Sequence, residues 1–113
     1  AVLHAAVLDA AAAGGRGLVQ AAVLAPDVAR FRPEEVDSVI DVVATTVEAE
    51  VAVVLKQVGD RRWASSMRSR GAVDVAAAAA RLGGGGHRAA AGFTRDGTLE
   101  EVRAEVRAAL QDA

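Results

Sequence analysis

The stretch VAVVLKQVGDRRWASSMRSR, residues 51–70, decides the fold of this chain. Its first part, Val51 to Val58, is a mostly apolar run rich in β-branched residues, which predicts a strand. Gly59-Asp60 then supplies a turn, and residues 61–70 read as a second strand. Two strand-like segments joined by a two-residue turn predict a β-hairpin.

The second strand of this hairpin carries different chemistry on its two faces, because successive side chains of a strand point to opposite sides. The face with the large apolar groups is expected to pack on the core; it holds Trp63, Ser65, Met67 and Ser69, with Arg61 at its end. The opposite face presents guanidinium groups and a hydroxyl; it holds Arg62, Ala64, Ser66, Arg68 and Arg70. Arginine suits phosphate because its planar head donates two parallel hydrogen bonds. The alternative is a solvated edge strand whose charges discourage aggregation.

After the hairpin, the chain predicts a short helix, a short strand and a longer helix. Asp74 is an N-cap for a helix that runs to Leu82 and ends at Gly83. Residues 91–95 form a brief strand before an Asp96-Gly97 turn.

The last helix is predicted from its first turn and its apolar spacing. Thr98 and Glu101 have the spacing of a capping box. The residues of its buried stripe recur at helical spacing; they are Leu99, Val102, Val106 and Leu110.

Before the hairpin, three segments have a regular pattern. Residues 1–13 are apolar almost all round and stop at Gly14-Gly15, which predicts the end of a helix that connects two domains. Residues 18–24 predict a strand buried on both faces, and residues 34–47, which follow Pro33, predict an amphipathic helix.

These elements predict an α/β fold: one small domain with a mixed sheet of roughly four strands and three or four helices. We expect residues 1–17 to be the end of an interdomain helix or linker and residues 18–113 to be the folded domain. Because the first residue is Ala rather than Met, we expect the chain to be a domain of a longer protein.

The composition excludes several classes of protein. The chain has 113 residues, of which 52% are hydrophobic and 25% charged, so it can form a core and is not intrinsically disordered. It has no apolar run long enough to span a membrane and no cysteine, which excludes disulfides and Cys-ligated zinc. Two histidines, His4 and His87, are too few for a His-based metal site without help from carboxylates. We expect a cytoplasmic location and no membrane partner.

The net charge of −2 conceals an uneven distribution. Residues 61–95 contain seven arginines and one acid, a net charge of +6, so the rest of the chain carries −8. Near-neutrality of the whole therefore does not argue against an anionic ligand at one face. The alternative is that these arginines are solvated surface residues.

Four consecutive glycines followed by a histidine, residues 83–87, form the second notable motif. One glycine is explained by the helix end, but four are not, because glycine runs are used where a ligand must approach the backbone. Free N–H groups in such a loop make an anion site, to which His87 could add a donor. The ending of a P-loop is missing, and the glycines follow a helix, which excludes a dinucleotide fingerprint. A plain surface histidine is the alternative for His87.

The two motifs together resemble the DHH-associated domain of the DHH phosphoesterases. That family has a strand with an S-x-R-S segment, here Ser66-Met67-Arg68-Ser69, followed by GGGH-x-x-A-A-G, here Gly84 to Gly92. The resemblance covers roughly residues 18–112. It is greatest to the bacterial bifunctional oligoribonuclease and phosphoadenosine phosphate phosphatase group, some of whose members act on cyclic di-AMP.

The resemblance implies a metal-dependent phosphoesterase whose substrates are short single-stranded RNA or small nucleotides. In that family a divalent metal, usually manganese, is held by a separate N-terminal DHH domain. This chain contains no Asp-His-His. We therefore expect no catalytic residue, metal ligand or cofactor within it, and no activity from it alone.

The resemblance also implies which residues bind substrate. Arg68 would bind a phosphate with support from Ser66, and His87 would hold the terminal nucleotide together with the backbone of Gly84, Gly85 and Gly86. Possible outer contacts are Arg62, Arg70 and Arg88. Two other functions stay open: a structural or oligomerisation domain like that appended to alanyl-tRNA synthetases, and a stand-alone ligand-sensing module.

Overall fold

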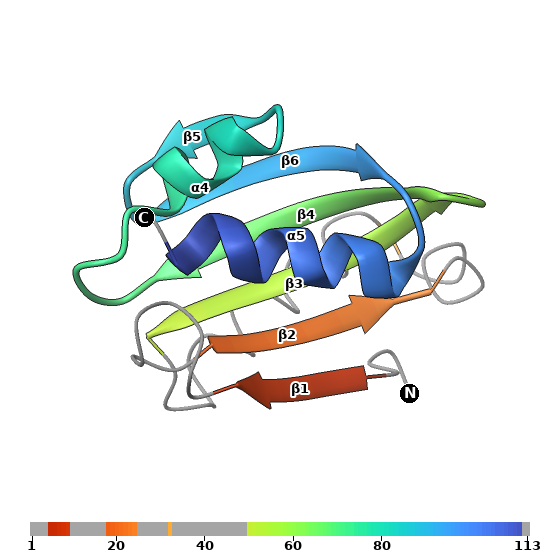
Figure 1. Cartoon of the computed structure of the whole chain (residues 1–113), viewed down its shortest axis with the longest axis horizontal. Helices are drawn as coiled ribbons and strands as arrows, with labels where there is room; N and C mark the ends of the chain where they lie inside the picture. The colour runs from red at the N-terminus through yellow and green to blue at the C-terminus, as the bar shows by residue number, and fades with distance from the viewer. Residues whose placement is uncertain (1–4, 10–17, 25–31, 33–49, 112–113) are drawn as a thin grey trace.

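The protein folds around one six-stranded mixed sheet (Figure 1). The structure is a computed structural model that describes residues 5–9, 18–24, 32 and 50–111. Its strands are β1 (Ala5–Asp9), β2 (Leu18–Val23), β3 (Val51–Gly59), β4 (Arg62–Ser69), β5 (Gly85–His87) and β6 (Ala90–Asp96). Its described helices are α4 (Val75–Arg81) and α5 (Leu99–Gln111). The strand order is β1-β2-β3-β4-β6-β5, in which β2 and β3 are parallel and the other neighbours antiparallel.

The hairpin predicted from residues 51–70 is confirmed as β3 and β4. The strands pair antiparallel, with Val53 opposite Met67, and the register shifts between Gln57 and Gly59 beside the turn. Trp63, Ser65 and Met67 are buried on the inward face of β4, and Ala64 and Ser66 between them are half-buried, as the alternation of the sequence predicts.

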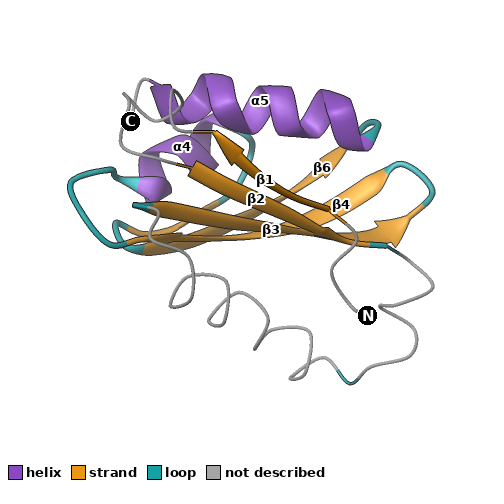
Figure 2. Cartoon of the chain, turned by 90° about the horizontal axis from the view of Figure 1, so that it is seen from below, coloured by secondary structure: helices purple, strands orange, loops and turns teal. Residues whose placement is uncertain are grey.

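Both described helices cover one face of the sheet (Figure 2). The buried stripe of α5 consists of Val102, Val106 and Leu110, each at most 1% exposed, and packs in one core with β3 and β4. The indole Nε1 of Trp63 donates a hydrogen bond of 2.9 Å to the Gly97 carbonyl, which attaches the turn before α5 to the end of β4.

The predicted helix caps are confirmed. The Asp74 carboxylate accepts hydrogen bonds from the backbone N–H groups of Ala76 and Ala77, at 3.0 and 3.1 Å. Thr98 and Glu101 form a reciprocal capping box at the start of α5, with distances of 2.8 and 3.1 Å. Each cap satisfies backbone donors that the first turn of a helix cannot pair internally.

Two parts of the sheet differ from the prediction. Residues 1–13 were expected to be helical, but Ala5–Asp9 forms the strand β1, paired antiparallel with β2. A short, uniformly apolar segment fits a strand as well as a helix, because it has no periodicity to separate the two. The predicted helix at 34–47 and the rest of residues 1–17 lie outside the described residues.

The strand β5 was not predicted either, so the mixed sheet has six strands rather than roughly four. Two of its three residues are glycines, which are disfavoured in strands and give no side-chain alternation. The other predicted segments are confirmed: residues 18–24 contain β2, and residues 91–95 lie within β6.

We predict that Asp74→Ala destabilises the domain by about 1 kcal/mol, the usual contribution of an N-cap side chain. Asp74→Asn should lose much less, because asparagine also accepts from the first-turn N–H groups. Urea unfolding of the two variants measures the difference. Equal losses would show that Asp74 contributes through its charge rather than as a cap.

Candidate functional site

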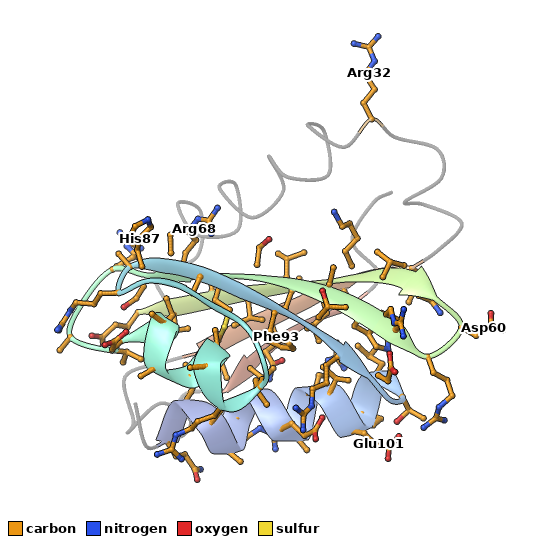
Figure 3. The ribbon with its side chains drawn as sticks, turned by 90° about the horizontal axis from the view of Figure 1, so that it is seen from above. Arg32, Asp60, Arg68, His87, Phe93 and Glu101 are labelled. Atoms are coloured by element: carbon orange, nitrogen blue, oxygen red, sulfur yellow. The ribbon has the colours of Figure 1, made fainter. Side chains whose placement is uncertain are left out.

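The site is built on the face of the sheet opposite to α5. Because Trp63 and Met67 point inward, Ser66 and Arg68 point outward from β4. The register then continues across two more strands: Arg68 pairs with Ala90, and Ala90 pairs with His87. Residues directly opposite in a ladder share a face, so Arg68 and His87 flank Ala90 on one surface, as Figure 3 shows.

A second row of the same surface lies next to the first. Ser66 pairs with Gly92, and Gly92 pairs with Gly85. Neighbouring strands are about 4.8 Å apart and alternate residues of a strand about 6.6 Å apart, so both rows fit within the footprint of one nucleotide. The structure thus brings together Ser66, Arg68, Gly85 and His87, which come from three strands.

The polar groups of these rows are accessible to different degrees. The His87 side chain is exposed, whereas Ser66 and Arg68 are half-buried. The guanidinium of Arg68 donates from Nη1 to the carbonyl of Met67 at 3.0 Å, which holds its head close to its own strand. Because this hydrogen bond already restricts the Arg68 side chain, the side chain loses less conformational freedom when it binds an anion.

Three glycines of the run 83–86 are required by the fold, and one of them is Gly83, whose φ of +87° lies in the left-handed region. At Gly84, a Cβ would collide with the Gly92 carbonyl oxygen and with Phe93. At Gly86, φ is +145°, and a Cβ would lie 2.6 Å from the Cα of Ala91. Larger residues at these positions would push β5 away from β6.

Gly85, in contrast, is not required by the fold. A Cβ built on it meets no atom within 4 Å, and its φ lies outside the left-handed region. Its Cβ position faces open space on the same surface as Ser66, and β5 is the edge strand of the sheet. An exposed position where a side chain would fit the fold, yet which is glycine, is typical of a surface that a ligand approaches closely.

Hydrogen bonds fix the loop that carries these groups. The N–H of Gly84 donates to the Ala79 carbonyl at 2.8 Å, so this N–H is used in closing α4 and is not free for a ligand. The turn between β5 and β6 is attached through Val75 N–H to Arg88 O at 3.0 Å and Ser69 N–H to Ala89 O at 2.9 Å. The Gly-rich segment is therefore positioned before any ligand arrives.

The three predicted outer arginines lie in different places. Arg88 is in the β5–β6 turn next to His87, and its Nη2 donates to the Ala72 carbonyl at 2.9 Å. Arg70 is exposed just beyond the end of β4. Arg62 lies at the other end of β4, about 20 Å from Arg68 along the strand.

Arg62 is already paired. Its Nε and Nη2 donate to both carboxylate oxygens of Asp96, at 2.8 and 3.4 Å. This hydrogen-bonded ion pair lowers the pKa of Asp96 and raises that of Arg62. Open hollows of about 530 and 420 Å³ lie beside this pair, and the larger one extends along β6 as far as Gly83.

The described residues hold no group of three or more His, Asp or Glu side chains that could bind a metal ion. None of the helices in this same part of the chain is both long and apolar enough to cross a membrane.

Comparison with known families agrees with this geometry. The family model of the DHHA1 domain matches residues 18–112, nearly the whole chain. The chain belongs to the DHHA1 domain family. The expected resemblance to the DHH-associated domain is thereby confirmed, and each row of the outward surface contains residues from both motifs that carried it.

Solved structures show the same fold within larger proteins. An exopolyphosphatase-related protein from Bacteroides fragilis superposes with a TM-score of 0.72 and 19% identity, over 84% of this chain and 28% of that one. A pGpG-specific phosphodiesterase from Vibrio cholerae superposes with a TM-score of 0.53 and 11% identity, over 84% of this chain and 32% of that one. The chain thus spans about a third or less of these proteins.

We predict that alanine destabilises the domain at one of two neighbouring glycines and has little effect at the other. Gly86→Ala should destabilise the domain by about 1–3 kcal/mol, because alanine is strained at this φ and crowds Ala91. Gly85→Ala should change the free energy of unfolding by less than about 0.5 kcal/mol. Thermal unfolding of both variants tests this, and a large loss in Gly85→Ala would show that the fold requires this glycine too.

Proposed function

We propose that this chain is the substrate-binding part of a metal-dependent DHH phosphoesterase that hydrolyses short oligoribonucleotides or small nucleotides. The observation that carries the proposal is Gly85: an exposed glycine without a structural requirement, on one surface with Arg68, Ser66 and His87. A purely structural or oligomerisation domain has no need for a glycine at that position.

Each residue has a role that follows from its place. The Arg68 guanidinium binds a phosphate group, and the Ser66 hydroxyl, one row away on the same face, donates a further hydrogen bond. The exposed His87 and the backbone of Gly85 and Gly86 hold the terminal nucleotide, which can approach closely because Gly85 has no side chain. Gly84 has a structural role: its N–H is already bonded to Ala79, and its missing Cβ lets it lie against Gly92 and Phe93 of β6. Arg88, in the adjoining turn, is the outer contact that this arrangement favours.

A short substrate suits the surface better than an extended single strand. Only 3% of the residues are aromatic, and Trp63 is buried with its indole N–H bonded to Gly97, so it cannot stack on a base. Extended single strands are usually held by a series of stacked bases. The names of the two similar structures, an exopolyphosphatase-related protein and a pGpG-specific phosphodiesterase, also fit a ligand recognised through phosphates.

We assign the chemistry of hydrolysis to an N-terminal DHH domain of the same protein, because the family resemblance implies that the metal ligands belong to that domain. The divalent metal, manganese in the related enzymes, would there stabilise charge at the scissile phosphate. Arg68 and the Gly-rich segment position the substrate for that step.

We predict that Arg68→Ala weakens binding of adenosine 5′-monophosphate at least about tenfold, because a charge-assisted hydrogen bond contributes about 1.5–3 kcal/mol. Arg68→Lys should recover part of the affinity, since it keeps the charge but not the two-pronged geometry. Isothermal titration at low salt measures both. The control is Arg81→Ala, on α4 at the other face of the sheet.

Equal affinity of wild type and Arg68→Ala would overturn the proposal. So would equal losses in Arg68→Ala and Arg81→Ala, since binding would then depend on net charge alone.

We further predict that Gly85→Ala folds normally but binds the nucleotide about tenfold more weakly, because the added methyl occupies the space of the ligand. The same titration, with thermal unfolding as the check on folding, gives the result. Unchanged affinity would show that the ligand does not approach β5.

A further inference from the structure

The outward surface continues past the two rows that hold the proposed nucleotide site. The next row along the strands contains Lys56 on β3, Ala64 on β4 and Thr94 on β6, because Lys56 pairs with Ala64 and Ala64 pairs with Thr94. Lys56 is half-buried and Thr94 is exposed. A cation and a hydroxyl therefore stand on either side of an alanine, on the same face as Arg68.

The surface between these rows carries no large side chain. Its residues across β4, β6 and β5 have small side chains or none; they are Ala64, Ser66, Ala90, Gly92 and Gly85. On the other side the surface is closed, because the outward residues Ala21, Ala52 and Val54 of β2 and β3 are at most 4% exposed. Lys56 therefore stands at the margin of an open strip that runs along β4 and β6.

The attraction of the strip for a phosphate ends one row further on. There Arg62 pairs with Asp96 across the ladder, and the two side chains form a two-pronged ion pair. Because the charges cancel, this row offers a phosphate little attraction. Two positive side chains lie along the described part of the strip, Arg68 at one end and Lys56 two rows away.

Arg68 and Lys56 are too far apart to share one phosphate. Four residue steps along the strands separate their rows, about 13 Å. The head of Arg68 is held to the Met67 carbonyl at 3.0 Å and so stays near its own row. A phosphate at Lys56 would be a different phosphate from the one at Arg68.

We propose that Lys56 and Thr94 form a second phosphate subsite, which binds an internal phosphodiester of a short oligonucleotide. The inference rests on the proposed function, since the first phosphate is the one assigned to Arg68. The subsite gives preference to oligonucleotides over mononucleotides, and the neutral Arg62–Asp96 row sets the end of the favourable strip. The spacing between Arg68 and Lys56 along the sheet thereby determines which ligand lengths bind more tightly.

The test is a length series of 5′-phosphorylated oligoadenylates, from one to four nucleotides, titrated into wild type and Lys56→Gln. In wild type the affinity should rise once the ligand is long enough to reach the second subsite. Lys56→Gln should remove about fivefold of that rise, the size of a partly exposed charge contact, and leave the mononucleotide unchanged. For the long ligands the slope of log K against log salt should fall by about 0.7, the value for one phosphate on a single strand.

Two further variants make the result specific. Thr94→Val removes only a hydroxyl and should weaken the long ligands about twofold while leaving the mononucleotide unaffected. Arg81→Gln removes an exposed positive charge from the other side of the sheet and should match wild type at every length. Thermal unfolding confirms that each variant is folded; if Lys56→Gln is not, Thr94→Val carries the test.

Three outcomes overturn the inference. If Lys56→Gln weakens all lengths equally, Lys56 does not read a second phosphate. If it changes none while Arg68→Ala still abolishes mononucleotide binding, the second subsite is wrong and the proposed function stands. If neither variant affects binding at any length, the proposed function itself fails.

Discussion

The register of β4 between β3 and β6 is the constraint on which the rest of the structure depends. Trp63 and Met67 point from β4 into the core, and Ser66 and Arg68 point to the candidate site on the opposite face. A shift of one residue would turn Trp63 and Met67 to solvent and bury Arg62 and Arg68. The Trp63–Gly97 hydrogen bond fixes one end of the strand and the Ser69–Ala89 hydrogen bond the other. Core packing thus holds the site residues in place.

The sequence was informative wherever the signal is local. The alternation along β4, the Asp74 cap and the Thr98–Glu101 box could all be predicted, because each depends on neighbours a few residues away. The order β4-β6-β5 could not, since it joins segments that are distant along the chain. For the same reason Lys56 and Gly92 were missed as members of the surface: only the register places them beside Ser66 and Ala64. β5 gave no signal, because glycine has no side chain to alternate.

The charge count of the sequence also has a different meaning in the folded protein. Residues 61–95 carry a net charge of +6, but three of their arginines pair with acids that follow this segment. Arg61 pairs with Glu101, Arg62 with Asp96 and Arg95 with Glu105, at 2.8–3.1 Å. The ion pairs of Arg61 and Arg62 neutralise the hairpin end of the sheet. The charge count of the sequence therefore overstates the positive charge at the hairpin end of the sheet.

Because a side chain at Gly85 would meet no neighbouring atom, a substitution there has a different consequence in a cell from one at Gly84 or Gly86. Chaperones and proteases act on unfolded or partly unfolded chains, so they remove variants that lose stability, such as those altered at Gly84 or Gly86. A variant altered at Gly85 is expected to keep its fold, so chaperones and proteases would not remove it. It would accumulate at normal abundance. Under the proposed function, such a variant would bind its ligand more weakly while the amount of protein stayed the same.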